Sequence, residues 1–244
     1  MIELRGVWKG FGSQQILEDI SMQVDDGEKL CIIGQSGSGK SVTMKIMTGL
    51  LKADRGEVWV EGENVTHFQN RDWNRITPNF GVVFQGAALF DSLTVLENIG
   101  IRMFEDRKVD HKKIHALAAE ALEQVGLDPE VNLGKFPSEL SGGMQKRVGI
   151  ARAIVHKPKV VFYDEPTTGL DPVNSGRIDG LMDLLSREPG RTSIIITHDM
   201  FTVKTIATKV AFIHNKRMHF WGTPEEMFAS NDMEIRKFLA RSIG

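Results

Sequence analysis

The stretch that decides the fold is 29-KLCIIGQSGSGKSVTMKIM-47. Its first residues, 29–34, form an apolar run typical of a buried strand, and the residues after Lys40 repeat apolar side chains at helical spacing. Between them, 34-GQSGSGKS-41 fits the pattern G-x-x-x-x-G-K-[ST], whose glycines let several backbone N–H groups point into one space. A chance match in a turn rich in glycine and serine is disfavoured by the strand before it and the helix after it. We therefore predict a strand, a phosphate-binding loop and a helix.

The side chains of this loop predict how a nucleoside triphosphate is held. Lys40 can reach the β- and γ-phosphates, and the hydroxyl of Ser41 can bind Mg²⁺. The positive end of the following helix dipole adds to the attraction for anions. We expect ATP and Mg²⁺ as cofactors, with further contacts to the phosphates from Gly34, Gln35, Ser36, Gly37, Ser38, Gly39 and Val42.

The bulk composition places the chain among ordinary globular proteins. Its 244 residues include 41% hydrophobic and 25% charged residues, with a formal net charge of -2, which argues against a nucleic-acid partner. No run approaches the roughly 18–20 apolar residues that span a bilayer, and 1-MIELRGVWKG-10 lacks a secretory-signal pattern. The one cysteine, Cys31, lies in an apolar run and predicts a buried strand residue in a reducing compartment. We expect a protein that is soluble or attached to a membrane through a partner.

Further strand and helix patterns predict an α/β fold. Apolar runs at 159–164 and 193–197 are each followed by polar residues and a helical pattern, as in a parallel sheet. Alternating side chains at 20–24 and 57–65 predict an antiparallel sheet near the N-terminus. A region from 87 to 157 is mostly helical. We predict a P-loop NTPase core with a parallel sheet and an antiparallel β-subdomain in 1–86 and 158–220, an inserted helical subdomain in 87–157, and a C-terminal helical extension in 221–244.

Polar side chains at the ends of predicted strands fit a hydrolytic site for ATP. Asp164 and Glu165 end the run 160-VVFYDE-165; the first could hold Mg²⁺ through water, and the second could polarise an attacking water. Gln85 ends 80-FGVVFQ-85 and could reach the Mg²⁺ or the water. His198 ends 193-SIIITH-198 and could donate to the γ-phosphate. Each of these residues alone would be an ordinary polar residue at a strand end, so the argument depends on their occurring together with the phosphate loop.

A second candidate phosphate site lies about a hundred residues downstream, in 140-LSGGMQKRVGIARA-153. Ser141 stands at the start of a predicted helix, and Gly142 and Gly143 permit close approach to its free N–H groups. A simple serine cap is the alternative reading of these residues. The apolar stripe of this helix leaves Lys146, Arg147 and Arg152 outside it.

The order of these motifs resembles the nucleotide-binding subunit of ABC transporters over essentially the whole chain. The resemblance implies a RecA-like core and two copies paired head to tail, in which the signature residues of one copy face the nucleotide held by the other. It makes Gln85 the Q-loop glutamine, Asp164 the Walker B acid and Glu165 the general base. It makes His198 the switch histidine. It also implies an aromatic residue that stacks on adenine, which is Phe11, with Trp8 as the alternative. Further nucleotide contacts are implied for Ser141, Gly142, Gly143, Gln145 and Asp171.

The segment 84-FQGAALFDSLTVLENIGI-101 is most similar to the ATPases of Mla-type phospholipid transporters with mammalian-cell-entry (MCE) domains. The resemblance implies a homodimer, two transmembrane permease subunits, an MCE-domain substrate-binding protein and, in some complexes, a small cytoplasmic regulatory subunit. It also implies a peripheral position on the cytoplasmic face of a bacterial inner membrane. A groove near Leu89, Phe90 and Leu93 would accept a permease helix.

Three alternatives to the lipid transporter remain at this point. The first is an importer ATPase for a small polar solute, although Met144 stands where such importers usually carry glutamine. The second is a soluble ABC protein outside transport, which usually has two cassettes or large insertions. The third is a nucleotide-binding switch without hydrolysis, which the presence of both Glu165 and His198 disfavours.

Overall fold

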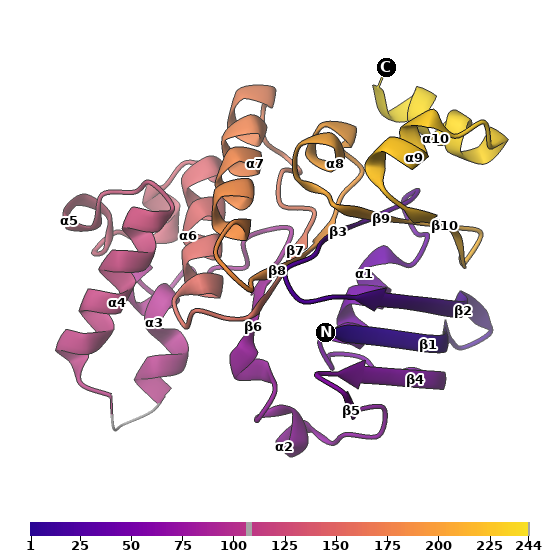
Figure 1. Ribbon diagram of the computed structural model, residues 1–244. Coiled ribbons are helices and arrows are strands. Elements are labelled where there is room, and N and C mark those ends of the chain that lie inside the picture. Colours follow the sequence, from indigo (N-terminus) through magenta and orange to yellow (C-terminus); the bar gives the residue numbers. More distant parts are fainter. Residues whose placement is uncertain (106–108, 244) are drawn as a thin grey trace. The chain divides into compact units, whose positions relative to one another are not determined.

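The computed structural model describes residues 1–105 and 109–243. These residues divide into two compact units, one made of 1–77 with 186–244 and the other of 78–185. Figure 1 shows the elements of each unit with their labels. The predicted boundaries at 86, 157 and 220 stay a prediction.

The first unit contains the predicted antiparallel sheet. Its strands are β1 (Ile2–Phe11), β2 (Gln14–Val24), β4 (Arg55–Val60) and β5 (Glu63–Asn64), in the order β2-β1-β4-β5. Buried and more exposed residues alternate along β2, as the sequence pattern predicts for a sheet with one covered face. Strands β1, β2 and β4 run side by side in Figure 1.

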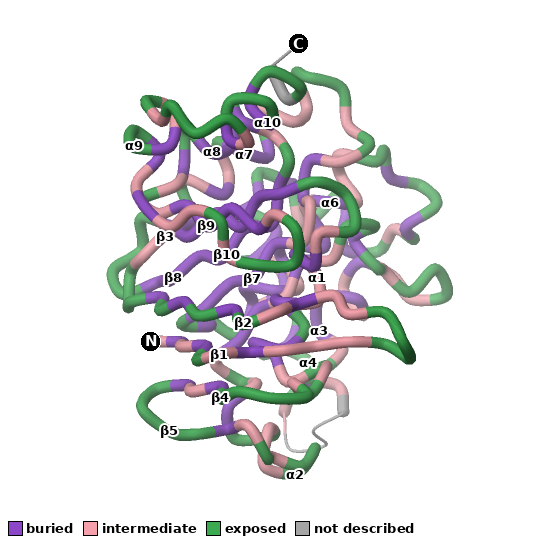
Figure 2. The backbone as a smooth tube through the Cα atoms, turned by 90° about the vertical axis from the view of Figure 1, so that its right-hand side faces the viewer, coloured by how far each residue is buried: buried purple, intermediate pink, exposed green. Residues whose placement is uncertain are grey.

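The same unit contains a second group of strands, three of which are mostly buried (Figure 2). Strand β3 (Lys29–Ile33) lies between β8 (Thr192–Ile196) and β9 (Lys209–His214) and is parallel to both. Strand β10 (Arg217–Gly222) pairs antiparallel with β9, a hairpin that the sequence analysis missed. The turn between them has Asn215 and Lys216 at positive φ, which is the backbone of a tight hairpin turn. Cys31 is fully buried in β3, as expected.

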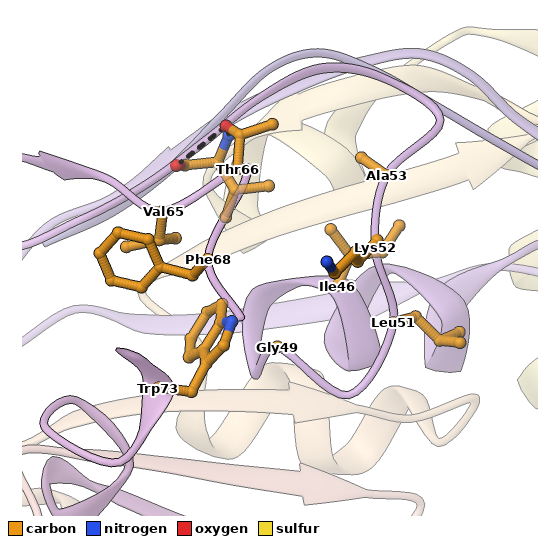
Figure 3. Close-up of a pocket in the computed structure, with 10 residues that line it drawn as sticks. Ile46, Gly49, Leu51, Lys52, Ala53, Val65, Thr66, Phe68 and Trp73 are labelled. Carbon is orange, nitrogen blue, oxygen red and sulfur yellow. Dashed lines mark hydrogen bonds between the residues drawn. The ribbon is translucent and has the colours of Figure 1, made fainter. Parts of the chain in front are cut away.

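The helices of the first unit begin with α1 (Lys40–Met47), which follows the phosphate loop. The short α2 (Asn70–Trp73) brings Trp73 against Gly49, where an added Cβ would lie 2.3 Å from the indole ring. Figure 3 shows Trp73 and Phe68 beside the end of α1, around a small hollow. The remaining helices are α8 (Met200–Ile206), α9 (Pro224–Ala229) and α10 (Met233–Ile243); α9 begins with a capping box of Thr223 and Glu226.

The second unit combines two parallel strands with helices. Strand β6 (Phe80–Val83) pairs with β7 (Val160–Asp164), and the predicted helical region supplies α3 (Val95–Glu105), α4 (His111–Gln124), α5 (Pro129–Asn132) and α6 (Gly142–Ile154). Helices α3, α4 and α6 pack on one another, and α7 (Pro172–Ser186) follows β7. The parallel strands and the antiparallel N-terminal sheet confirm the predicted α/β fold class.

Candidate active site

Two glycines lock the phosphate loop in place within the first unit. At Gly34, with φ 154°, an added Cβ would lie 2.4 Å from the carbonyl oxygen of Ile213 in β9. At Gly39, with φ 100°, an added Cβ would lie 2.4 Å from Leu17 Cδ2 in β2. Both positions combine a left-handed backbone with a close approach that only glycine allows. The loop thus packs closely against β2 and β9 at its two ends.

The polar groups of the loop are arranged for an anion. Lys40 is only 6% exposed, and its ammonium donates to the carbonyl oxygens of Gly34 at 2.9 Å and Gln35 at 3.0 Å. Ser38 Oγ is buried and has no hydrogen-bond partner within the described residues. A buried hydroxyl without a partner is costly, and a phosphate oxygen at the mouth of the loop would provide one. The loop and the start of α1 therefore fit the phosphates of a nucleotide, with Ser41 in the first turn of α1.

The two candidates for stacking on adenine differ in exposure. Phe11 ends β1 and is 49% exposed, with the Lys9 ammonium 5.4 Å from its ring centroid. Trp8 lies further back in β1, where it pairs with Arg55 of β4, and is half-buried. The turn after Phe11 leads directly to Ile16 and Leu17, which contact Gly39 of the phosphate loop. Phe11 is therefore closer in the sequence than Trp8 to β2, the strand that packs on the phosphate loop.

His198 lies just after β8, which ends at Ile196, and it is exposed. The next residue, Asp199, caps α8 by accepting a hydrogen bond from the N–H of Phe201 at 2.8 Å. The N–H of Asp199 in turn donates to Thr197 Oγ1 at 2.9 Å. These contacts fix the backbone on both sides of the histidine.

In the second unit, the two acids lie where β7 ends. Asp164 is the last residue of β7, and Glu165 follows with φ 46°, a left-handed conformation that is unusual for a glutamate. Such a conformation costs about 1–3 kcal/mol and persists only where the surroundings impose it. Thr168 Oγ1 donates to Glu165 Oε2 at 2.8 Å. The strand end thus presents a carboxylate that is held by its neighbours, as a positioned base requires.

Gln85 is exposed just after β6, but its main chain is held by α6. Its carbonyl oxygen accepts a hydrogen bond from the Lys146 ammonium. The carbonyl oxygens of Ala87 and Ala88 accept from the Arg152 guanidinium, each at 2.7 Å. Lys146 lies outside the apolar stripe of α6 and is nevertheless only 7% exposed, because the segment that begins at Gln85 covers that side of the helix.

The burial of Lys146 and Arg152 lowers the pKa values of both side chains. Desolvation lowers the pKa of Lys146, and the negative charge of Glu165 partly opposes this shift. Desolvation also lowers the pKa of Arg152. Sequence reasoning missed both residues because a lysine or arginine outside an apolar stripe usually points into water.

The signature residues lie at the start of α6. Ser141 is the N-cap of this helix and accepts from the N–H of Met144 at 3.4 Å, which confirms the serine cap. Gly142 has open space where a side chain would stand, and at Gly143 an added Cβ would lie 3.6 Å from Asn174 Oδ1. The Gln145 amide donates to the carbonyl oxygens of Pro137 and Leu140, so in the single chain it binds the segment before the helix. The exposed N–H groups of this helix end remain suited to an anion.

Asp171 caps the next helix of the same unit. Its Oδ1 accepts from the N–H groups of Val173 and Asn174, both at 3.0 Å, and its Oδ2 accepts from the Asn174 amide at 2.5 Å. The hydrogen bonds from Asn174, above all, hold the pKa of Asp171 below its usual value. Asp171 therefore has a structural task in the single chain, besides any contact it makes with a nucleotide or a second copy.

The structure thus brings the predicted residues together in two groups. The first unit holds Phe11, the loop 34–42 and His198, and the second holds Gln85, the signature 141–145, Asp164, Glu165 and Asp171. Thr168, Asn174, Lys146 and Arg152 join the second group as unpredicted neighbours. Among the described residues, no helix is long and apolar enough to cross a membrane.

Comparison with known proteins agrees with this reading. Residues 17–168 match the family described as ABC transporter. The chain is 35% identical over its full length to a probable ribonucleotide transport ATP-binding protein, mkl, of Mycobacterium leprae, and covers 70% of that protein. It is 36% identical to the chloroplastic protein TRIGALACTOSYLDIACYLGLYCEROL 3 of Arabidopsis thaliana, with 100% of this chain and 74% of that protein covered.

A solved structure gives the same result for the fold and the reaction. The dimeric ATP-binding cassette MJ0796, in a post-hydrolysis state bound to ADP and Pi, superposes with a TM-score of 0.84 at 29% identity. The match covers 92% of this chain and 99% of that one. Cassettes of this family bind ATP with Mg²⁺ in the P-loop fold and hydrolyse it. The chain belongs to the ABC transporter family, in which it is an ATP-binding subunit with ATPase activity.

Proposed function

We propose that this chain is the ATPase of a phospholipid transporter in a bacterial envelope. The observation that carries the lipid assignment is the full-length similarity to a relative whose name refers to trigalactosyldiacylglycerol, a galactolipid. The segment 84-FQGAALFDSLTVLENIGI-101, which resembles the ATPases of MCE-type lipid transporters, supports the same substrate class. The complex would contain two copies of this chain, two permease subunits, an MCE-domain protein and, in some cases, a small regulatory subunit.

Two copies would share their nucleotides. In each chain the phosphate loop contributes Lys40 and Ser41, whereas the start of α6 offers Ser141 and the open side of Gly142. A two-fold head-to-tail pairing turns two such half-sites into two whole ones. The dimeric state of the similar cassette MJ0796 supports this arrangement.

Within each nucleotide site, the chain's residues divide the work of hydrolysis. Phe11 stacks on adenine, and the loop 34–42 binds the phosphates. Glu165 accepts a proton from the attacking water, and His198 donates to the γ-phosphate. Ser41, Gln85 and Asp164 would hold Mg²⁺, which supplies positive charge to the phosphate oxygens when it is bound.

The permease would dock near the start of α3. Phe90 is 52% exposed, although the loop that carries it is held firmly by Asn98. This fully buried asparagine accepts from the N–H of Phe90 at 2.8 Å and donates to the carbonyl oxygens of Phe90, Leu93 and Thr94. An exposed aromatic residue on an ordered loop is a typical anchor for a partner helix. The complex would place this chain at the cytoplasmic face of the inner membrane.

A second candidate is the ATPase of a transporter for a small polar solute. The similarity to mkl, whose name refers to ribonucleotide transport, favours it. An ABC protein without a permease is the third candidate. All three share the nucleotide site and differ in the proteins that surround the chain.

Co-purification tests these candidates. The chain, tagged at its native locus, is extracted from membranes in mild detergent, and its partners are identified by mass spectrometry. We expect a multi-span permease and an MCE-domain protein. A permease with a solute-binding protein would replace the lipid assignment with the importer, and recovery without any membrane partner would remove the transporter.

A further inference from the structure

One face of α6 binds the segment 85–88, which follows β6. Lys146, Gly149 and Arg152 are spaced by three residues and so lie one above the next on the helix. Lys146 donates to the Gln85 carbonyl oxygen, and an added Cβ at Gly149 would lie 3.2 Å from Ala87 Cβ. The Arg152 Nη2 and Nη1 atoms donate to Ala87 and Ala88. The absence of a side chain at Gly149 lets the main chain come close enough for the two cations to bind it.

The segment 85–88 has a strained backbone at two residues. Ala87 and Ala88 are consecutive residues with φ 59° and φ 48°, a conformation that alanine rarely adopts. Strained residues persist where the surrounding structure imposes them, and here the guanidinium of Arg152 binds both carbonyl oxygens. The conformation of the main chain at Gln85 is therefore imposed by α6.

Lys146 connects this segment with the acids at the end of β7. A buried ammonium needs both a hydrogen-bond acceptor and a compensating negative charge. The Gln85 carbonyl oxygen is the acceptor, and the negative charge of Glu165 favours the charged form of the ammonium. All three residues belong to the same compact unit.

We propose that Lys146 is a positioning residue for ATP hydrolysis, which holds the Gln85 main chain and the Glu165 carboxylate in a fixed relation to each other. Arg152 fixes the strained turn behind Gln85. This proposal rests on the proposed roles of Gln85 and Glu165 at the nucleotide. Because misplacement by about 1 Å can lower a rate by about a hundredfold, a group that only positions others can still limit turnover.

The test compares three variants of the full chain. Lys146→Met removes the charge and keeps an unbranched side chain, Lys146→Arg keeps the charge, and Arg147→Met is the matched control. Arg147 lies on the same helix and donates at 3.3 Å to the carbonyl oxygens of Val125 and Gly126, away from Gln85. For K146M we expect kcat to fall about tenfold or more with the KM for ATP within about twofold, a pattern that indicates a lost transition-state interaction. For K146R we expect partial recovery of kcat, and for R147M a kcat close to wild type.

Hydrogen exchange of the Ala87 N–H is a second measurement, and it requires neither nucleotide nor turnover. The Ala87 N–H donates to the Phe84 carbonyl oxygen at 2.9 Å, so its hydrogen exchange reports the order of the turn. We expect exchange at Ala87 to be faster in nucleotide-free K146M and unchanged in R147M. Wild-type kcat in K146M would overturn the proposal, as would a loss of kcat without faster exchange at Ala87. A K146R protein as slow as K146M would overturn the requirement for charge.

The result also separates this proposal from the one on which it rests. If Glu165→Gln retains turnover, the general-base assignment fails. A loss of kcat in K146M could then not be explained by the position of the Glu165 carboxylate. If Glu165→Gln is inactive and K146M is normal in kcat, the general base stands and only the role of Lys146 is lost.

Discussion

Thr168 donates a hydrogen bond from its Oγ1 to Oε2 of Glu165 at 2.8 Å, from three residues further along the chain. Glu165 itself has a left-handed backbone with φ 46°. The turn after β7 therefore restrains both the main chain and the side chain of this glutamate. A carboxylate restrained in this way is oriented before the substrate arrives, which is what a general base needs.

The first prediction concerns Glu165 itself. Glu165→Gln keeps the size of the side chain and one oxygen that can accept a hydrogen bond, but removes its charge and basicity. We expect ATP binding to be retained and an ATP-bound dimer to accumulate, while hydrolysis falls by about 10²- to 10⁴-fold. Phosphate release and size-exclusion chromatography with ATP measure the two effects. Hydrolysis near the wild-type rate would contradict the assignment of the base.

Thr168 provides a milder version of the same test. Thr168→Val keeps the branched shape and removes the hydroxyl, so the Glu165 carboxylate loses a partner. We expect kcat to fall by about tenfold with little change in KM, since a hydrogen bond to a charged group contributes about 1.5–3 kcal/mol. Thr168→Ser keeps the hydroxyl and serves as the control, with a kcat close to wild type. Equal losses in both variants would mean that packing, and not the hydrogen bond, matters.

Ser141 tests whether the nucleotide is shared between two copies. Ser141→Arg places a long side chain at the exposed start of α6, where a second copy's nucleotide would lie. We expect hydrolysis to be lost, whereas the isolated chain still binds ATP with a Kd within about threefold of wild type. Equilibrium binding with a fluorescent ATP analogue measures the second quantity. Loss of binding by the monomer would argue for a site within one chain.

Phe11 and Trp8 are distinguished by their substitution with alanine. Phe11→Ala removes an exposed ring, and we expect the Kd for ATP to rise about tenfold, as is typical for a lost aromatic stacking partner of about 1–3 kcal/mol. Trp8→Ala should change the Kd much less, because Trp8 lies within the sheet beside Arg55. Titration calorimetry on the two variants decides between them, and the reverse order of effects would identify Trp8 as the stacking residue.

The stability of α7 should depend on pH through Asp171. Its pKa is lowered in the folded state, so its charge stabilises the fold above its ordinary pKa near 4, and this contribution is lost as the pH falls through the lower folded value. Asp171→Asn keeps a capping side chain without the charge. We expect its Tm to lie below that of the wild type at pH 7 and to approach it as the pH falls below about 4. Asp171→Ala should be less stable than the wild type at both pH values.

The sequence predicted those parts of the site in which local chemistry determines local structure. Gly34 and Gly39 reveal the phosphate loop because few other patterns combine that spacing with a strand and a helix. The buried strands at 29–33, 160–164 and 192–196 follow from apolar runs that have no polar alternation. Ser141 as a helix cap follows from the same kind of local rule.

The residues that were missed depend on contacts between segments distant in the chain. Lys146 is buried because residues 85–88, sixty positions earlier, lie across its face of α6, and no periodicity within the helix reveals this. The β9–β10 hairpin was missed because Asn215-Lys216 is a less familiar turn than the asparagine–glycine pair. Thr168 lies in a loop without periodicity, and only its position relative to Glu165 gives it a role.

Cys31 is fully buried in β3 and is the one cysteine of the chain. The native protein therefore offers almost no accessible thiol to maleimide dyes or spin labels. A cysteine introduced at a chosen surface position would be labelled selectively, without prior removal of a native residue. Distances between two such labels, one on each copy, would report whether the separation of the two copies changes when ATP is added.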